Sequence, residues 1–135
     1  MFPATARLAP AYRATAYVVR RPGRETVLRI GAPPPPLPWG ACRQAAFVTA
    51  CNPGSRPRPP AANRRAEKRL AAALRRRGLR LLAGVGRGDG GDWPAEPSLL
   101  VFGLTRRGAA ALGRALRQNA VLHLGRRAVV LIPLV

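Results

Sequence analysis

Short apolar runs, each bounded by turn-forming residues, recur along the chain. Runs of this kind are typical of β-strands rather than helices. In the first run, AYRATAYVVR, residues with high β-propensity occupy both sets of alternating positions. The runs predict strands at residues 11–20, 26–31, 45–51, 79–85, 98–104, 120–124 and 128–135.

Two segments have helical rather than alternating periodicity. Residues 61–77 and 106–118 repeat small apolar side chains every three or four positions, with arginines between them. Thr105 supplies an N-cap hydroxyl for the second helix, and Gly78 supplies the left-handed position that commonly ends a helix such as the first. The inward faces are predicted to hold Ala66, Leu70, Ala73 and Leu74 in the first helix, and Ala109, Leu112, Ala115 and Leu116 in the second.

The resulting order, β-β-β-α-β-β-α-β-β, predicts the fold class. We expect one α+β domain over residues 1–135, with a largely antiparallel sheet of six or seven strands and both helices on one face. Residues 1–10 are predicted to be a flexible N-terminus, and the proline-rich residues 31–41 a stiff crossover in polyproline II conformation. Pro133 places the last strand at a sheet edge, because proline donates no ladder hydrogen bond. The order of the strands does not follow from the sequence.

The charge of the chain points to anionic partners. Lysine and arginine total 24 against 5 acidic residues, giving a net charge of +19, and Lys68 is the only lysine. Arginine binds phosphate in a planar, bidentate way, so an RNA or DNA backbone is a possible partner. A compositional bias toward Ala, Arg, Gly and Pro explains the same excess, and a membrane surface or an acidic protein are further alternatives. The candidate nucleic-acid contacts on the first helix are Arg64, Arg65, Lys68, Arg75 and Arg76.

Few residues suggest a metal, a cofactor or a redox function. Cys42 and Cys51 are nine positions apart without a CxxC motif or a nearby histidine, so we expect no metal site and no cofactor. Both cysteines fit a reducing, cytoplasmic compartment. The longest apolar stretch, residues 128–135, is far shorter than the ~20 residues of a membrane span, so no membrane-spanning segment is predicted.

The sequence leaves open whether the protein is an enzyme. Residues 86–91 read GxGxxG, but a strand rather than a helix follows, which excludes a dinucleotide fold. Asp89, Asp92 and Glu96 share one loop, and three interpretations of these acids stand open. They bind a divalent cation, they act as a general acid and base, or they only neutralise local positive charge. His123 lies on a short strand without a nucleophile at a familiar spacing, and we expect it to be structural.

Three segments together resemble a known family. FVTACNPGSRP at 47–57, GDWPAEPSLLVFGLT at 91–105 and ALGRALRQNAVL at 111–122 are similar, in order and spacing, to the bacterial domain of unknown function 3293 family. The resemblance covers about residues 45–122 and implies no activity, since none is established for the family. The arginine-rich first helix departs from the family, in which acidic residues are more usual there. The family's polar motif positions are Asn52, Ser55, Arg56, Asp92, Glu96, Gln118 and Asn119.

These polar positions fall at the ends of predicted elements, which suggests a pocket. If the sheet brings those ends together, Asn52, Arg56, Asp92, Glu96 and Gln118 line a site for a phosphate- or carboxylate-bearing molecule. Three function classes therefore stand: nonspecific nucleic-acid contact as the leading one, a small enzyme or ligand-binding domain, and a protein-interaction module. The last would use the proline run or an open sheet edge to bind a protein partner. The oligomeric state does not follow from the sequence.

Overall fold

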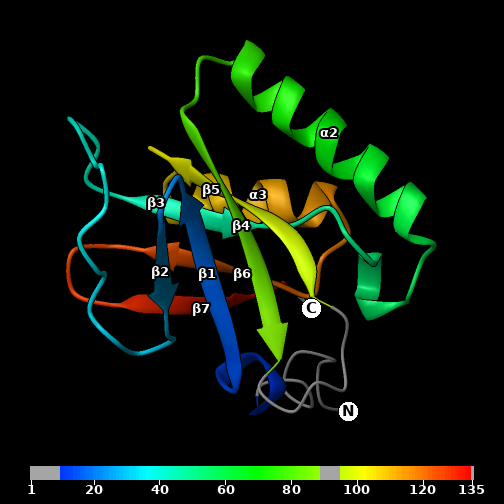
Figure 1. The fold of residues 1–135 in the computed structure, drawn as a ribbon, viewed down its shortest axis with the longest axis horizontal. Helices are drawn as coiled ribbons and strands as arrows, with labels where there is room; N and C mark the ends of the chain where they lie inside the picture. The colour runs from blue at the N-terminus through cyan, green and yellow to red at the C-terminus, as the bar shows by residue number, and fades with distance from the viewer. Residues whose placement is uncertain (1–9, 89–94, 135) are drawn as a thin grey trace.

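The computed structural model describes residues 10–88 and 95–134. Residues 10–13 are helical and precede the first strand, and the element labels below follow Figure 1. The predicted order of seven strands and two main helices is confirmed. The elements are β1 (Thr15–Arg21), β2 (Arg24–Leu28), β3 (Ala45–Val48), the 3-10 turn η1 (Pro53–Ser55), α2 (Pro60–Arg76), β4 (Leu81–Gly88), β5 (Glu96–Phe102), α3 (Arg106–Ala115), β6 (Ala120–Leu124) and β7 (Val129–Pro133).

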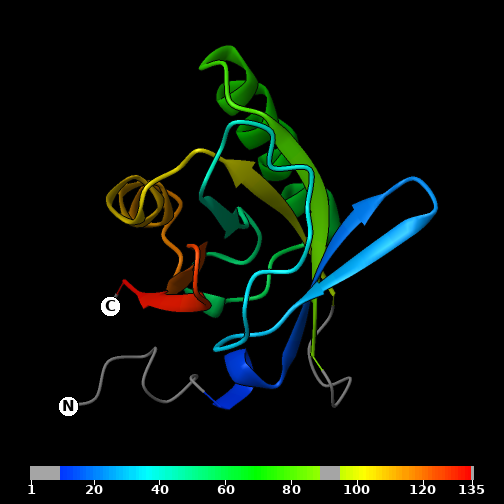
Figure 2. The same cartoon turned by 90° about the vertical axis from the view of Figure 1, so that its left-hand side faces the viewer.

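All seven strands form one antiparallel sheet, in the order β2-β1-β4-β5-β3-β6-β7. The sheet curls strongly, so that Tyr17 of β1 and Val129 of β7 share one apolar cluster although four strands separate β1 from β7. Figure 2 shows the β1–β2 hairpin and the β6–β7 pair on opposite sides of this curl. The fold is therefore α+β as predicted, and β7 is an edge strand, as Pro133 indicated.

The two helices cover one face of the sheet, as expected. Alternate residues of the central strands, such as Val48 and Val101, pack with Leu70 and Leu74 of α2 and Ala109 of α3. Helix α2 lies over β4 and β5, and α3 lies over β3 and β6. Burial of these side chains stabilises the fold by about 25 cal/mol for each Å² of apolar surface removed from water.

The opposite, concave face is covered by the chain itself. Phe47, Leu100 and Phe102 face this side, and the segment between β2 and β3 packs over them with Leu37 and Trp39. The Trp39 and Phe102 rings meet edge to face at 5.6 Å, and Figure 2 shows the segment in cyan. The proline-rich crossover thus completes the core instead of standing free of the domain.

Both predicted helix-end signals act as expected. The Gly108 N–H donates to the Thr105 hydroxyl at 3.0 Å, which caps α3. Gly78 has φ +79°, and the N–H groups of Gly78 and Leu79 donate to the carbonyls of Arg75 and Leu74, which is the Schellman arrangement.

Several predicted element boundaries are wrong: the second strand ends at Leu28 rather than at residue 31, and the fourth at Gly88 rather than at residue 85. Local hydrogen bonds explain two others. Residues 11–13 are helical instead of extended, because Pro10 starts a turn closed by bonds from Ala14 N–H and the Thr15 hydroxyl. Strand β3 ends at Val48 rather than at residue 51. The reason is that the N–H groups of Ala50 and Cys51 donate to the side chains of Glu67 and Thr49 instead of to a neighbouring strand. Helix α3 ends at Ala115 rather than at residue 118.

Gly84 permits the close packing inside the curl, and its substitution gives a first prediction. A Cβ at Gly84 would lie 2.7 Å from the Phe47 ring and 2.8 Å from the Val18 carbonyl oxygen. We expect Gly84→Ala to lower the free energy of unfolding by about 2 kcal/mol, measured by urea denaturation. Gly86→Ala is the matched control, since its Cβ would meet nothing closer than 3.8 Å. Equal losses in the two variants would contradict the packing argument.

Candidate functional site

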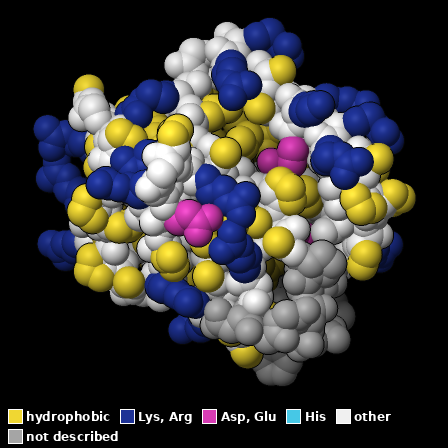
Figure 3. Space-filling view, viewed as in Figure 1, with side chains coloured by type: hydrophobic (Ala, Val, Ile, Leu, Met, Phe, Trp, Pro, Cys, Tyr) yellow, Lys and Arg dark blue, Asp and Glu magenta, His cyan; other side chains and the backbone are white. Residues whose placement is uncertain are grey.

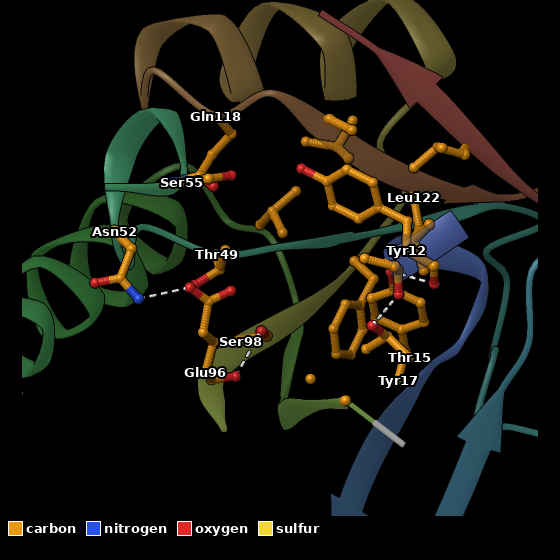
Figure 4. Close-up of a pocket in the computed structure, with 18 of the residues that line it drawn as sticks. Tyr12, Thr15, Tyr17, Thr49, Asn52, Ser55, Glu96, Ser98, Gln118 and Leu122 are labelled. Atoms are coloured by element: carbon orange, nitrogen blue, oxygen red, sulfur yellow. Dashed lines mark hydrogen bonds between the residues drawn. The ribbon is translucent and has the colours of Figure 1, made fainter. Parts of the chain in front are cut away.

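A cavity of about 360 Å³ opens at one end of the curled sheet. The antiparallel order brings the starts of β1, β5 and β6 and the ends of β3 and β4 to this same end. Residues from all five strands line the cavity, together with the loop that contains η1 and the helical residues before β1. Segments far apart in the sequence therefore build one pocket, which Figure 4 shows in close-up.

One wall of the pocket is polar. It combines the end of β3, the η1 loop, the start of β5 and the residues before β6. Figure 4 shows these side chains grouped on one side of the cavity. The polar wall consists of Thr49, Asn52, Ser55, Glu96, Ser98 and Gln118.

The opposite wall is aromatic and aliphatic. Tyr17 meets Phe47 edge to face at 5.7 Å, and the Tyr17 hydroxyl donates to the Tyr12 carbonyl oxygen at 2.8 Å. Figure 4 shows the Tyr12 ring reaching across the cavity toward Ser55. Gly86 and Gly88 add bare backbone to the lining, and Leu122 adds an aliphatic side chain. This wall offers flat apolar surface to a ligand.

Asn52 connects the polar wall to the rest of the fold. Its side-chain Nδ2 donates to Glu96 Oε2 at 2.6 Å. Its Oδ1 accepts from the Arg58 N–H at 2.9 Å and from Asn63 Nδ2 at 2.8 Å, while its own N–H donates to Asn63 Oδ1 at 3.0 Å. Asn52 is 7% exposed. Its side chain therefore fixes the Glu96 carboxylate against both the η1 loop and α2.

Unusual backbone conformations concentrate beside this wall. Among the described residues, the non-glycine positions with positive φ are Asn52 at 47°, Ser55 at 60° and Arg117 at 57°. They lie on two loops, and the Gly54 N–H of one loop donates to the Arg117 carbonyl of the other at 2.8 Å. Such conformations cost energy and cluster at functional sites, where the surroundings hold them. The pocket wall therefore contains three uncommon backbone conformations, and hydrogen bonds between the two loops support them.

Side chains reinforce the junction between the two loops. Gln118 Nε2 donates to the Cys51 carbonyl at 3.0 Å, and Asn119 Nδ2 donates to the Ser55 hydroxyl at 2.9 Å. Both amides are buried. These two hydrogen bonds from the loop after α3 thereby fix the position of the η1 loop.

Two acceptor atoms of the polar wall are left for a ligand. Glu96 Oε2 and Gln118 Nε2 are engaged as described, whereas Glu96 Oε1 and Gln118 Oε1 make no hydrogen bond or ion pair with any described residue. A carboxylate oxygen and an amide oxygen both accept hydrogen bonds. Among the described residues, the pocket lining includes no arginine, lysine or histidine. The wall is chemically suited to donors rather than to anions.

Burial keeps the tyrosine and cysteine side chains here in their neutral forms. It raises the pKa of Tyr12 and of Tyr17, so both phenols stay protonated at neutral pH. Burial also raises the pKa of the Cys51 thiol to about 11, although the Thr49 hydroxyl opposes this effect. Because the thiolate is the nucleophile, this shift disfavours reaction of Cys51 at neutral pH.

A second carboxylate lies behind the polar wall. Glu67 of α2 accepts a hydrogen bond from the Ala50 N–H and another from the Thr49 hydroxyl at 3.2 Å. Burial raises the pKa of Glu67 to about 7, against the effect of these two bonds, and the Glu96 carboxylate raises it further. The two carboxyl groups are therefore electrostatically linked across the wall.

The structure brings four of the predicted site residues together and separates others. Asn52, Ser55, Glu96 and Gln118 line the pocket, and Asn119 supports Ser55 from behind. Arg56 is exposed and contributes nothing to the lining, so its predicted place in the pocket is wrong. The reason is its position one residue beyond η1, where the chain turns away in extended conformation.

Other predicted features fall outside the pocket or outside the described residues. Asp89 and Asp92, and the flexible N-terminus predicted at 1–10 except Pro10, lie outside the described residues. Within the described ranges, no group of three or more His, Cys, Asp and Glu side chains comes together as a metal site. The buried His123 ring contacts Gln44 Oε1 at 3.0 Å and the Leu104 carbonyl at 3.1 Å, in the structural position expected.

Sequence reasoning missed the aromatic wall and the buried acid. Tyr12 and Tyr17 were assigned to one continuous strand, which conceals the turn that carries Tyr12 over the cavity. Glu67 had a readable signal, because it stands three and seven positions before Leu70 and Leu74 of the predicted apolar stripe. An acid at this spacing faces the core and needs partners there.

The fold and the site together define a class of protein: a small α+β domain whose curled antiparallel sheet holds a preformed pocket at one end. The chain belongs to the family described as Protein of unknown function (DUF3293), whose model matches residues 48–121, more than half of the chain. This match confirms the resemblance drawn from the sequence motifs, and the matched segment includes the whole polar wall. Comparisons with curated proteins and with solved structures returned no match. None of the helices in the described part of the chain is long and apolar enough to cross a membrane.

Proposed function

We propose that the pocket binds a small nitrogen-containing compound with a flat apolar body. The ligand class is an amine, an amidine or an amino-substituted heterocycle, whose N–H groups donate to Glu96 Oε1 and Gln118 Oε1. The single observation that carries this proposal is the pair of free acceptors facing an aromatic wall in a cavity of about 360 Å³. Small-molecule sites combine such an apolar lining with a few convergent polar groups.

The charge of the lining distinguishes this ligand from the phosphate or carboxylate compound predicted from the sequence. An anion would face the Glu96 carboxylate, and no arginine, lysine or histidine among the described lining residues offsets the repulsion. A cationic or neutral donor gains a charge-assisted hydrogen bond from the same group. We therefore favour a donor ligand over an anion.

The hydrogen bonds of the polar wall favour a ligand of one particular geometry. Asn52 fixes one oxygen of Glu96 at 2.6 Å, so the other oxygen points in a defined direction. The strained loops hold this arrangement before any ligand arrives. Binding to such a site loses less free energy to ordering of side chains than binding to a mobile one.

Two flat probes of opposite charge test the proposal. Benzamidine carries an aromatic ring with a cationic donor end, and benzoate carries the same ring with an anionic acceptor end. We expect benzamidine to shift the amide NMR resonances of residues around Glu96 and Gln118 in a saturable way, at millimolar or lower concentration. Benzoate is expected to leave these resonances unchanged, because the carboxylate repels it.

Matched carboxylate variants complete the experiment. Glu96→Gln removes the acceptor charge in the pocket, whereas Glu25→Gln removes an equal charge from β2, where Glu25 pairs with Arg20 and Arg87. We expect at least a tenfold loss of benzamidine affinity in the first variant and none in the second. Preferential binding of benzoate in the pocket, or equal effects of the two variants, would overturn the proposed ligand class.

The other two predicted functions use different parts of the molecule. Contact with a nucleic-acid backbone would involve the exposed basic side chains of α2, which do not line the pocket. A protein partner for the proline run would have to compete with the domain itself, since the same segment packs Leu37 and Trp39 onto the concave face. We therefore favour ligand binding in the pocket over these two functions.

A further inference from the structure

The outer face of α2 carries a stripe of positive charge, interrupted at residues 70–74. This basic stripe consists of exposed side chains that follow the helix from its second turn to its last, and Figure 3 shows Lys and Arg side chains along α2 at the upper right. At 1.5 Å per residue, the stripe spans about 18 Å. Its members are Arg64, Arg65, Lys68, Arg69, Arg75 and Arg76.

No described carboxylate neutralises this stripe. Glu67 belongs to α2 but is buried on the inner face, Glu96 lies in the pocket, and Glu25 pairs with Arg20 and Arg87. Like charges four positions apart, as in Arg64 with Lys68 and in Arg65 with Arg69, destabilise a helix. The helix therefore has an unrelieved self-repulsion that a bound polyanion would remove.

The distribution of aromatic side chains indicates which polyanion fits. Every aromatic residue in the described ranges belongs to the concave-face cluster or packs against it, on the side of the sheet away from α2: Tyr12, Tyr17, Trp39, Phe47 and Phe102. Proteins that bind single strands stack bases on exposed aromatic rings. A stripe of charge without such rings suits the phosphates of a duplex, whose bases are already stacked on one another.

We propose that the basic stripe of α2 binds the backbone of double-stranded nucleic acid, without reading its bases. About 18 Å of duplex carries roughly ten phosphate charges on its two strands, more than the six side chains of the stripe. Guanidinium groups hold phosphate oxygens through paired hydrogen bonds, which suits the arginine-rich composition of the stripe. The proposal is independent of the ligand in the pocket, because the two sites share no residues.

Two triple variants with the same net charge test the location of binding. Arg65→Gln/Arg69→Gln/Arg76→Gln removes three charges from the stripe, and glutamine is nearly as good a helix former as arginine. Arg24→Gln/Arg126→Gln/Arg127→Gln removes three exposed charges elsewhere. Fluorescence anisotropy with a labelled 20-base-pair DNA duplex is recorded from 50 to 200 mM salt, and circular dichroism verifies that both variants are folded.

The expected results distinguish binding at the basic stripe from a general effect of the positive net charge. The stripe variant should lose at least tenfold in duplex affinity at 100 mM salt, and the slope of log affinity against log salt should flatten by about 2 to 3. The control variant should lose less than threefold. Equal losses in the two variants would overturn the proposal, and so would tighter binding of a 20-nucleotide single strand or of polyglutamate than of the duplex.

Discussion

Replacing Glu67 with glutamine is expected to remove a pH dependence of stability of about 3 kcal/mol. The folded protein holds this carboxyl with a pKa of about 7, against an ordinary value of 4.5, because burial disfavours the charged form. Between these two values the folded state retains a proton that the unfolded state has released. The contribution of Glu67 to stability is therefore fully present below about pH 4.5 and is lost as the pH rises toward 7.

The measurement is the difference in free energy of unfolding between the wild-type protein and Glu67→Gln, from urea denaturation between pH 4 and pH 8. Taking the difference cancels the titration of other groups that the two proteins share. We expect the wild type to lose about 3 kcal/mol relative to the variant across this range. Glu25→Gln is the control, because Glu25 is exposed on β2. A difference that stays constant with pH would show that Glu67 ionises as it does in water.

The second large effect is expected at Asn52, where one side chain joins three partners. Asn52→Ala removes the hydrogen bonds to Glu96, the Arg58 N–H and Asn63, each worth about 1 kcal/mol net. The left-handed backbone at this position, with φ 47°, strains alanine and asparagine alike, because both have a Cβ. We therefore expect a loss of about 3 kcal/mol in the free energy of unfolding, from the hydrogen bonds.

Asn52→Gly separates the effect of the hydrogen bonds from that of the backbone strain. Glycine adopts the left-handed conformation freely, so this variant should recover about 1 kcal/mol of the loss caused by alanine. Both variants should weaken benzamidine binding, because the Glu96 carboxylate loses the donor that orients it. Stability equal to wild type in Asn52→Gly would contradict the assigned role of the amide.

Much of the fold could be predicted because its signals are local. Apolar runs located the seven strands, and the periodicity of Leu70 and Leu74 located the buried stripe of α2. The N-cap of Thr105 and the glycine stop at Gly78 depend on one or two residues each, and both are confirmed. For α3 the prediction was less accurate: Ala115 is exposed, while Ala110 and Gly113 are buried.

The polar wall could be predicted in part for a different reason. Asn52, Glu96 and Gln118 stand at the ends of elements, and an antiparallel sheet of short strands brings many such ends to one edge. The sequence does not specify which way a side chain points after a strand ends. Arg56 shows this, because one extended residue beyond η1 is enough to send it to the surface.

The aromatic wall could not be predicted because it depends on the curl of the sheet. The side chains of Tyr17 and Leu131 approach the same cavity only because strands at opposite ends of the sheet turn toward one another. Strand order and curvature depend on packing between distant residues, such as the Phe47 ring against Gly84. No local pattern in the sequence encodes that contact.

The pairing of the crossover with β7 has a consequence for the behaviour of the protein at high concentration. The Gly31 N–H donates to the Val129 carbonyl and the Val129 N–H donates to the Ala32 carbonyl, while Pro133 has no N–H to offer. Backbone groups two residues apart point to the same side of a strand, so Val129, Leu131 and Pro133 face the outer edge of β7. Val129 is already paired and Pro133 has no N–H, so only Leu131 offers both a donor and an acceptor there. A single residue is too short a template for another chain to extend the sheet, which protects the protein from fibril growth and domain swapping at β7.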